Sequence, residues 1–439
     1  MWDTITAISS GKINQAISII RITGPEAKQI IKKIFKGKEG KNKEITFGYI
    51  YDGDKKVDEV LIAWFLGTDN FIGEDTIEIN AHGGIVVSNM ILKLILANGA
   101  RMAQPGEFSR RAYLNGKMSL IKAEAINDLI HAKTEKQVSM SISRFDNNLN
   151  NLINSFLDTI LYLIGHCEVN IDYPEMDDIA ELTNEEMKEK LIFLSNEIEK
   201  IIKVSANAQK IYEGIKVAII GRPNVGKSSL LNALIKEDKA IVTDIEGTTR
   251  DSVEANFQID GVLFQLIDTA GIRETVDVVE KIGIEKAKQT IEKCDIVLHV
   301  IDTTKELDSQ DIEIEKLSKN KKYIRVFNKV DVSNFNDEKT IKISAKNNQI
   351  QELEQVLLES YKDVDLNSEY LMYNTRQLAL VKGAQISLQD AIQGLEDGFG
   401  PEVVIVDIHE AWKKIASIIG KDTNEDLLDS IFSNFCLGK

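Results

Sequence analysis

The hydrophobic pattern of the chain changes along its length, and the first change lies near residue 117. Before that point, short apolar runs such as 17–22 and 60–65 alternate with turn signals that contain glycine, proline or aspartate. This pattern predicts a small α/β domain. From about residue 118, apolar residues instead recur at intervals of three and four, which is typical of amphipathic helices.

Long helices are predicted in the second region. The first spans 138–163, where apolar residues follow one another along one helical face. The next begins at the capping box Thr183-Asn184-Glu185-Glu186, because the Thr183 hydroxyl and the Glu186 carboxylate can satisfy free N–H groups of the first turn. Helical patterns return at 378–392 and 411–418. The sequence therefore predicts a helical bundle built from two separated stretches of chain.

Between these stretches, strands and helices alternate from about residue 214 to 362, beginning with the apolar strand 215–220. An insertion is tolerated where its two ends lie close together, so we expect an α/β domain inserted into a discontinuous helical domain. The predicted domains are 1–117, 118–213, 214–362 and 363–439, the second and fourth being parts of one helical domain. The fold class is multidomain, α/β plus all-α.

Composition excludes several classes of protein. The chain has 439 residues, more than one hydrophobic core usually organises, and no apolar run approaches the roughly 20 residues of a membrane helix. Cys167, Cys294 and Cys436 are widely separated, which argues against a disulfide framework or a cysteine zinc site. The segment Met1-Trp2-Asp3-Thr4 lacks the pattern of a secretory signal, so we expect a cytoplasmic protein with no membrane span.

The net charge of −16 argues against a general nucleic-acid coat, because phosphate binding needs a basic surface. If the protein handles RNA, we expect a local patch or a partner to do so. The five histidines are scattered and show no metal-ligand spacing.

One glycine-rich segment has the clearest chemistry. Residues 221–228 fit the phosphate-binding pattern G-x-x-x-x-G-K-[ST] and lie between a predicted strand and a predicted helix. The glycines let backbone N–H groups face phosphates, Lys227 offers a positive charge, and the Ser228 hydroxyl can hold Mg²⁺. Alone, such a segment could simply close a strand–helix connection.

Three companion motifs follow in the order and context of a GTPase. Asp268-Thr269-Ala270-Gly271 follows an apolar strand and puts a carboxylate next to Mg²⁺. Asn328-Lys329-Val330-Asp331 follows another, and Asp331 can accept hydrogen bonds from the N1 and N2 groups of guanine. Ser344-Ala345-Lys346 supplies a loop that flanks the base. The nucleotide is therefore expected to be GTP, and the domain a P-loop, Ras-like G domain.

The segment 243–251 is interpreted as switch I, where Thr249 is the natural second ligand of Mg²⁺. After Gly271, Ras-like enzymes carry a water-orienting glutamine, whereas this chain has Ile272. Catalysis must therefore be assembled differently. The residues expected at the nucleotide are Asn224, Val225, Gly226, Lys227, Ser228, Ser229, Thr243, Asp244, Ile245, Glu246, Gly247, Thr248, Thr249, Asp268, Thr269, Ala270, Gly271, Asn328, Lys329, Asp331, Ser344, Ala345 and Lys346.

The Gly-Thr-Thr-Arg-Asp segment 247–251, the run 268–274 with Glu280 downstream, and the terminal run 435–439 make the whole chain resemble the MnmE (TrmE) family of tRNA-modification GTPases, among the TrmE-Era-EngA-like GTPases. The resemblance implies that Glu280 orients the attacking water when two G domains meet. It also implies a K⁺ site that replaces an arginine finger. Its ligands would be Asn224, Thr243, Ile245 and Thr248. From the residues alone, Glu280 would be an ordinary solvated carboxylate.

The resemblance extends to the predicted N-terminal domain, which it identifies as a folate-binding and dimerisation module. Arg21, Glu78 and Lys117 match positions that contact a one-carbon tetrahydrofolate such as 5-formyltetrahydrofolate. Cys436 becomes a functional thiol near that site, with Lys439 also in contact. From the residues alone, Arg21 and Glu78 could equally form a structural ion pair, and Cys436 could be a buried structural cysteine.

The resemblance further implies a homodimer that joins an MnmG-like, FAD-dependent partner in a heterotetramer. The complex would add an aminomethyl-type (carboxymethylaminomethyl) group to C5 of the wobble uridine of tRNA, which the chain meets directly or through its partner. The expected activity is K⁺-dependent GTP hydrolysis through G-domain dimerisation. The alternatives are a ribosome-assembly GTPase without covalent RNA chemistry, which predicts a basic RNA-binding appendage, and a membrane-remodelling GTPase, which predicts a basic amphipathic helix or a lipid anchor.

Overall fold

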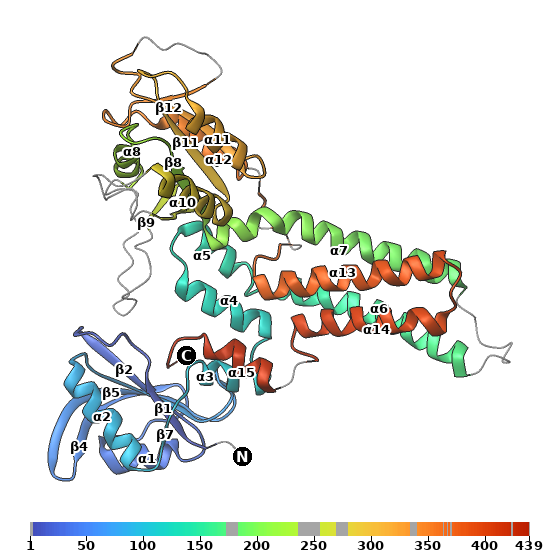
Figure 1. Ribbon diagram of the computed structural model, residues 1–439. Helices are drawn as coiled ribbons and strands as arrows, with labels where there is room; N and C mark the ends of the chain where they lie inside the picture. The colour runs from blue at the N-terminus through green and yellow to red at the C-terminus, as the bar shows by residue number, and fades with distance from the viewer. Residues whose placement is uncertain are drawn as a thin grey trace. The chain divides into compact units, whose positions relative to one another are not determined.

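The structure is a computed structural model whose helices and strands are labelled in Figure 1. It describes residues 3–172, 183–235, 255–268, 280–333, 340–362, 364–366, 368, 371–422 and 425–438. The chain forms two compact units, one of residues 1–127, 144–162 and 412–439 and the other of residues 128–143 and 163–411.

A seven-stranded sheet with the order β3-β4-β5-β6-β2-β1-β7 organises the unit that contains the N-terminal residues. Neighbouring strands are antiparallel, except that β1 and β7 are parallel. The elements are β1 (Ile5–Ile8), β2 (Ile17–Thr23), α1 (Ala27–Ile34), β3 (Phe35–Gly37), β4 (Glu44–Asp52), β5 (Lys55–Phe65), β6 (Thr76–His82), α2 (Ile85–Ala97) and β7 (Arg101–Met102). The α/β character expected from the apolar runs 17–22 and 60–65 is confirmed, because these runs lie within β2 and β5.

Helix α1 packs on one face of this sheet and forms part of its hydrophobic core. Its buried residues Ala27, Ile30, Ile31 and Ile34 follow the three- and four-residue spacing of one helical face. They pack in a cluster with Ile residues of the sheet and of α2. Truncating a fully buried isoleucine such as Ile31 to alanine would cost about 2–5 kcal/mol of stability.

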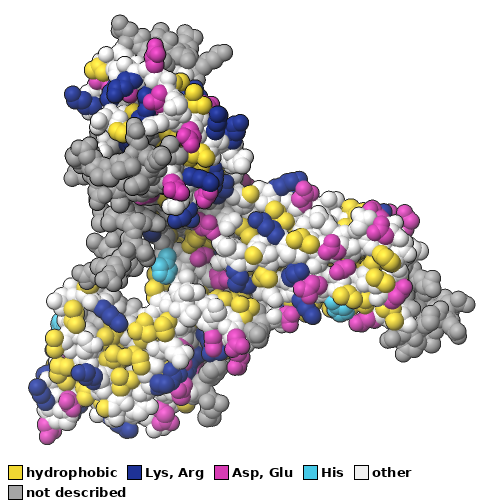
Figure 2. Space-filling view, in the orientation of Figure 1, with side chains coloured by type: hydrophobic (Ala, Val, Ile, Leu, Met, Phe, Trp, Pro, Cys, Tyr) yellow, Lys and Arg dark blue, Asp and Glu magenta, His cyan; other side chains and the backbone are white. Residues whose placement is uncertain are grey.

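The same unit exposes large hydrophobic side chains. Figure 2 shows hydrophobic side chains gathered on its surface. On β4, Ile45 and Phe47 are 66% and 52% exposed, and Leu61, the partner of Phe47 on β5, is 48% exposed. Thr46 and Ile50 of β4 are buried, so the alternation of the strand places the exposed side chains on the face opposite the core.

This unit also contains the helices α3 (Glu107–Leu114), α15 (Glu425–Ser433) and most of α4 (Leu120–His131), whose end belongs to the other unit. Phe432 and Phe435 pack with Ala112 and Leu120 in one cluster. Gly106 adopts φ +66, and a Cβ atom there would clash with the carbonyl oxygen of Phe432. The C-terminal segment is therefore packed closely against α3.

The long helices are α6 (Asn148–Asp172), α7 (Asn184–Glu213), α13 (Thr375–Glu396) and α14 (Pro401–Ile418), and the short helix α5 (Glu135–Ile142) precedes them. The capping box predicted before α7 is confirmed. The Thr183 hydroxyl accepts the N–H of Glu186 at 3.2 Å, and the Glu186 carboxylate accepts the N–H of Thr183 at 3.0 Å. In the same unit, α7 lies beside α13, and the Gln385 amide donates to Ser195 Oγ at 3.0 Å.

The prediction of one helix over 138–163 is wrong, because α5 ends at Ile142 and α6 begins at Asn148. The interruption contains Asp146 and Asn147, whose short polar side chains compete with helical hydrogen bonds. The apolar spacing continues across the interruption for a different reason. Met140 belongs to the core of one unit, and Phe145 packs against a core of the other.

A six-stranded sheet with the order β13-β12-β11-β8-β10-β9 lies in the second unit. Its strands are parallel except for the antiparallel pair β9–β10. The elements are β8 (Ile215–Ile220), α8 (Lys227–Leu234), β9 (Ala255–Ile259), β10 (Val262–Leu266), α10 (Glu280–Lys293), β11 (Ile296–Asp302), α11 (Ser309–Leu317), β12 (Lys322–Asn328), β13 (Ile341–Ile343) and α12 (Gln351–Glu359). The predicted strand 215–220 is confirmed.

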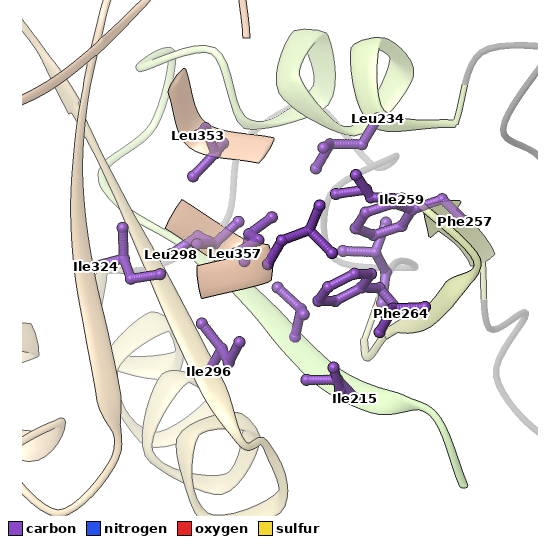
Figure 3. Packing of buried hydrophobic residues seen from close by; sticks show 14 of the residues in the cluster. Ile215, Leu234, Phe257, Ile259, Phe264, Ile296, Leu298, Ile324, Leu353 and Leu357 are labelled. Atoms are coloured by element: carbon purple, nitrogen blue, oxygen red, sulfur yellow. The ribbon is translucent and has the colours of Figure 1, made fainter. Parts of the chain in front are cut away.

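Helices cover both faces of this sheet, so its central strands are buried throughout. Every residue of β11 is buried. On one face Leu298 packs with Leu353 and Leu357 of α12 (Figure 3), and on the other Val297 packs with Ile314 of α11. The sheet is therefore a rigid platform for the loops at its carboxyl edge.

Within the described ranges, none of the helices is both long enough and apolar enough to cross a membrane.

Candidate functional site

The predicted nucleotide motifs converge at the carboxyl ends of the parallel strands. The segment 221–226 joins β8 to α8, the segment 329–333 follows β12, and the segment 344–349 follows β13. In open α/β sheets, ligands bind at this edge, where loops of successive strands meet. The sequence motifs are thus brought together by the strand order.

The glycine-rich segment has the backbone of a phosphate-binding loop. Gly221 and Gly226 adopt φ +155 and +101. A Cβ atom on Gly226 would clash with Asn328 Nδ2, and one on Gly221 would clash with the carbonyl oxygen of Val300. Both positions therefore require glycine. Gly226 is the N-cap of α8, so the loop ends at the first turn of a helix, where backbone N–H groups can bind phosphates.

Lys227 closes this loop on itself. Its Nζ donates to the carbonyl oxygens of Gly221 and Arg222, both at 2.7 Å. Burial lowers the pKa of Lys227, because the ammonium group has left water. A phosphate beside Lys227 would favour its charged form. Nucleotide binding would therefore raise the pKa of Lys227, and the charged form would bind the phosphate more tightly.

Asn328 connects three of the four motifs. It is 3% exposed, its Nδ2 donates to the carbonyl oxygen of Val225 at 2.9 Å, and its Oδ1 accepts the N–H of Ala345 at 3.0 Å. Beside it, Lys329 Nζ donates to the carbonyl oxygen of Asn224 at 2.9 Å. The segments predicted to recognise the base thereby fix the position of the glycine-rich loop.

Asp331 is held as a carboxylate. Ser344 Oγ donates to Asp331 Oδ1 at 2.6 Å, and this hydrogen bond lowers the pKa of Asp331. An ionised carboxylate is the acceptor that recognition of guanine N1 and N2 needs. Ser344, predicted to flank the base, therefore also contacts the residue predicted to recognise it.

Three non-glycine residues of the motifs have left-handed backbones, with φ of 63 at Asn224, 58 at Asp268 and 69 at Lys329. Such conformations are strained for residues with a Cβ atom and cluster at ligand sites. Asp268 follows β10, and its Oδ2 accepts the hydroxyl of Thr290 at 3.1 Å. Ser228 and Ser229 lie in the first turn of α8.

The predicted folate residues Arg21 and Glu78 face each other on β2 and β6. Arg21 Nη2 lies 2.7 Å from Glu78 Oε1, so the two residues do form an ion pair. Arg21 Nη1 also donates to the carbonyl oxygen of Gly438 at 3.0 Å, as does Ser9 Oγ at 3.0 Å. The C-terminal segment is therefore attached to the sheet at Arg21.

This attachment places Cys436 in the same region, two residues before Gly438. Cys436 is partly exposed, whereas Cys167 and Cys294 are buried. Burial raises the pKa of both Cys167 and Cys294 to about 11. Lys117, the third predicted folate residue, lies beside Gly73, where a Cβ atom would come within 2.9 Å of Lys117 Cε.

Comparison with known proteins decides the family. The family model "MnmE helical domain" matches residues 120–436, and "GTP-binding protein TrmE N-terminus" matches residues 4–117. The tRNA modification GTPase MnmE of Mycoplasmopsis pulmonis is 55% identical over 442 residues, which cover 100% of both chains. That of Mycoplasma mobile is 53% identical with the same coverage. The chain belongs to the MnmE family of tRNA modification GTPases. It is a GTP hydrolase that acts in tRNA modification.

Among solved structures, the G domain of the T. maritima FeoB iron transporter is 25% identical. It aligns with a TM-score of 0.25 over 33% of this chain and 97% of its own.

Several residues assigned to the site of this MnmE-family chain lie outside the described residues. The side chain of Glu280, at the start of α10, is among them. The roles predicted for these residues stay predictions. The others are Thr243, Asp244, Ile245, Glu246, Gly247, Thr248, Thr249, Thr269, Ala270, Gly271, Ile272 and Lys439.

Sequence reasoning missed Asp302, at the end of β11. Its side chain is 2% exposed, and Lys329 Nζ lies 2.7 Å from Asp302 Oδ2. Burial alone would raise the pKa of Asp302, but hydrogen bonds from Lys329 and Thr304 lower it overall. The sequence did offer a signal for Asp302, which is a charged residue at the end of an apolar strand. The carboxyl ends of the parallel strands form the edge of the sheet where the nucleotide motifs meet.

Proposed function

We propose that GTP hydrolysis by this chain depends on K⁺ and on the pairing of two G domains. Asn224 carries the proposal, because it is exposed on the phosphate loop and its backbone is fixed by the 2.9 Å hydrogen bond from Lys329. Its amide oxygen is a neutral ligand, which suits a large and weakly hydrated monovalent cation. Family resemblance supplies the other ligands Thr243, Ile245 and Thr248.

The need for such a cation follows from Ile272, which stands where Ras-like enzymes carry glutamine. An arginine finger contributes about 10³ to 10⁵ in rate, and a fixed cation would supply part of the same electrostatic stabilisation. In this proposal Ser228 and Thr249 hold Mg²⁺. Glu280 orients the attacking water. Lys227 and the backbone of the loop hold the phosphates.

The second part of the proposal concerns the N-terminal sheet. A one-carbon tetrahydrofolate such as 5-formyltetrahydrofolate binds at Arg21, Glu78 and Lys117, with Cys436 and Lys439 nearby. The hydrogen bond between Arg21 and Gly438 supports this placement, because it brings the C-terminal segment to the same residues. The Arg21–Glu78 ion pair would then present one cation and one anion, 17% and 20% exposed, to a polar heterocycle.

The third part concerns the assembly and its substrate. The chain acts as a cytoplasmic homodimer with an MnmG-like, FAD-dependent partner, and together they install a carboxymethylaminomethyl group on C5 of the tRNA wobble uridine. The exposed apolar residues of β4 and β5 support dimerisation through the N-terminal domain. The domains proposed are 1–117, 118–213 with 363–439, and the inserted G domain 214–362.

The test of K⁺ dependence is steady-state GTP hydrolysis in KCl and in NaCl at matched ionic strength, across a series of protein dilutions. We expect a higher rate in KCl and a specific rate that rises with protein concentration. Asn224→Ala should remove the advantage of KCl, whereas Asn320→Ala, an exposed asparagine after α11, should keep it. Equal rates in both salts at every concentration would refute the proposal.

A further inference from the structure

A second set of contacts holds the phosphate loop, and none of the nucleotide motifs accounts for it. Arg222 follows Gly221 in the loop, and its side chain is 14% exposed. Its Nη1 lies 2.8 Å from Asp308 Oδ2, and its Nη2 donates to the carbonyl oxygen of Glu306 at 2.9 Å. Its Nε lies 3.1 Å from Asp311 Oδ2. The guanidinium group is thus fixed by the segment that leads into α11.

Asp311 is itself fixed from the sheet. Its side chain is 3% exposed, and its Oδ1 lies 3.1 Å from Nε2 of His299, which is 1% exposed on β11. His299 Nδ1 lies 2.6 Å from the hydroxyl of Tyr323 on β12. Strands β8 and β11 pair with Ile220 opposite His299, and Ile220 is the residue before Gly221. His299 therefore lies on the strand beside the start of the phosphate loop.

The donor and acceptor properties of Tyr323, His299 and Asp311 indicate where the hydrogens lie between them. A carboxylate only accepts, so His299 donates from Nε2 to Asp311 and accepts the Tyr323 hydroxyl at Nδ1. This is the neutral imidazole, in keeping with the burial that lowers the pKa of His299. Asp311 therefore uses separate oxygens for its two side-chain partners, Oδ1 for His299 and Oδ2 for Arg222, and Oδ2 also accepts the backbone N–H of Asp308 at 3.2 Å.

The backbone of Arg222 contacts Lys227, the residue expected to bind the phosphates. Its carbonyl oxygen accepts Lys227 Nζ at 2.7 Å. The opposite side of the loop is held at Asn224 and Val225 by Lys329 and Asn328. Loss of the Arg222 side-chain contacts would detach the first half of the loop, which contains one acceptor of Lys227, from α11 and the segment before it.

We propose that Asp311 and His299 are positioning residues for GTP hydrolysis, which hold the Arg222 half of the phosphate loop and through it Lys227. Neither residue contacts the nucleotide in this proposal. They act because phosphoryl transfer depends on placing fixed donors around the phosphates, and a displacement of about 1 Å can cost about a hundredfold in rate.

Asp311→Asn tests this directly, because the carboxylate accepts donors at both oxygens, whereas an amide has only one oxygen, and its NH2 group would face a donor instead. Steady-state hydrolysis is measured with saturating Mg²⁺ in a buffer containing both KCl and NaCl, so the result does not depend on which cation assists. The rate is divided by the number of GDP-binding sites, so unfolded protein does not contribute. We expect kcat/KM per site to fall about tenfold, the effect of a modest displacement of the loop.

Two further variants separate positioning from stability. His299→Gln can still donate to Asp311 and accept from Tyr323, so its kcat/KM should stay within about twofold of the wild type. His299→Leu should behave like Asp311→Asn. Glu315→Gln, which breaks the surface ion pair between Glu315 of α11 and Arg325, is the matched control and should leave the rate unchanged. If His299→Leu does not fold, Asp311→Asn decides. A kcat/KM per site for Asp311→Asn within about twofold of the wild type would overturn the proposal, whatever its thermal stability.

Discussion

We propose that recognition of the base depends on one carboxylate, that of Asp331. The Ser344 hydroxyl donates to it and lowers its pKa, so at neutral pH Asp331 can only accept hydrogen bonds. Guanine offers N–H donors at N1 and N2, whereas xanthine carries a carbonyl oxygen in place of the 2-amino group. In this proposal, the preference for GTP depends on the acceptor character of the Asp331 side chain.

Asp331→Asn should shift the preference from GTP toward xanthosine triphosphate, because an amide can donate to the xanthine carbonyl. The measurement is kcat/KM for both nucleotides, with Asp260→Asn, at an exposed surface ion pair, as the control. An unchanged preference for GTP would show that Asp331 does not recognise the base.

The three cysteines should differ in reactivity. With a pKa of about 11, only about one in a thousand of the Cys167 and Cys294 thiols is ionised at pH 8, and both are buried. Cys436 is partly exposed. Iodoacetamide on the native protein at pH 8 should therefore label Cys436, and Cys436→Ser should remove nearly all labelling. Peptide mass mapping measures this, and labelling of Cys167 or Cys294 before Cys436 would contradict the assignment.

Cys436→Ser should also abolish tRNA modification in cells while GTP hydrolysis stays largely intact. The reason is that Cys436 lies in the segment attached to Arg21, in a different unit from the nucleotide motifs. Restoration of the modified nucleoside by the serine variant in a deletion strain would mean that the thiol is structural or dispensable.

At the scale of elements, local rules predicted those parts of the fold that local chemistry decides. The strand 215–220 and the capping box at Thr183 were found where the sequence predicted them. The helix break between Ile142 and Asn148 was missed, because the apolar spacing on both sides is set by two different cores. The spacing of apolar residues predicts which face of a helix is buried, but it does not predict which hydrophobic core that face packs against.

The capping box gives a test at this scale. Thr183→Ala removes the hydroxyl that accepts the N–H of Glu186, at a cost of about 1 kcal/mol to the first turn of α7. Amide hydrogens of residues 184–187 should then exchange about fivefold faster by mass spectrometry, the factor that 1 kcal/mol corresponds to. Thr159→Ala is the control, because Thr159 Oγ1 donates within α6 and caps no helix. Unchanged exchange at α7 would show that the cap contributes nothing measurable.

At the scale of the whole molecule, the motifs predicted the residues of the nucleotide site but not the residues that hold them in place. Lys227, Asn328 and Asp331 lie where the motif order implies, because each lies at or after the carboxyl end of a strand of one sheet. Asp302, Asp311 and His299 were missed, since each comes from a strand or helix with no motif and meets its partner only after the sheet has formed. The attachment of Gly438 to Arg21 joins residues 417 positions apart, a separation that no local pattern reports.

The central claim, that this GTPase takes part in wobble-uridine modification, is tested most directly by mass analysis of tRNA nucleosides from cells that lack the chain. We expect 5-carboxymethylaminomethyl uridine to disappear in the deletion strain and to return when the wild-type chain is expressed. The Lys227→Ala variant should fail to restore it, because Lys227 closes the phosphate loop. A deletion strain with the modified nucleoside at its wild-type level, together with an altered profile of ribosomal subunits, would contradict the account and favour a ribosome-assembly GTPase.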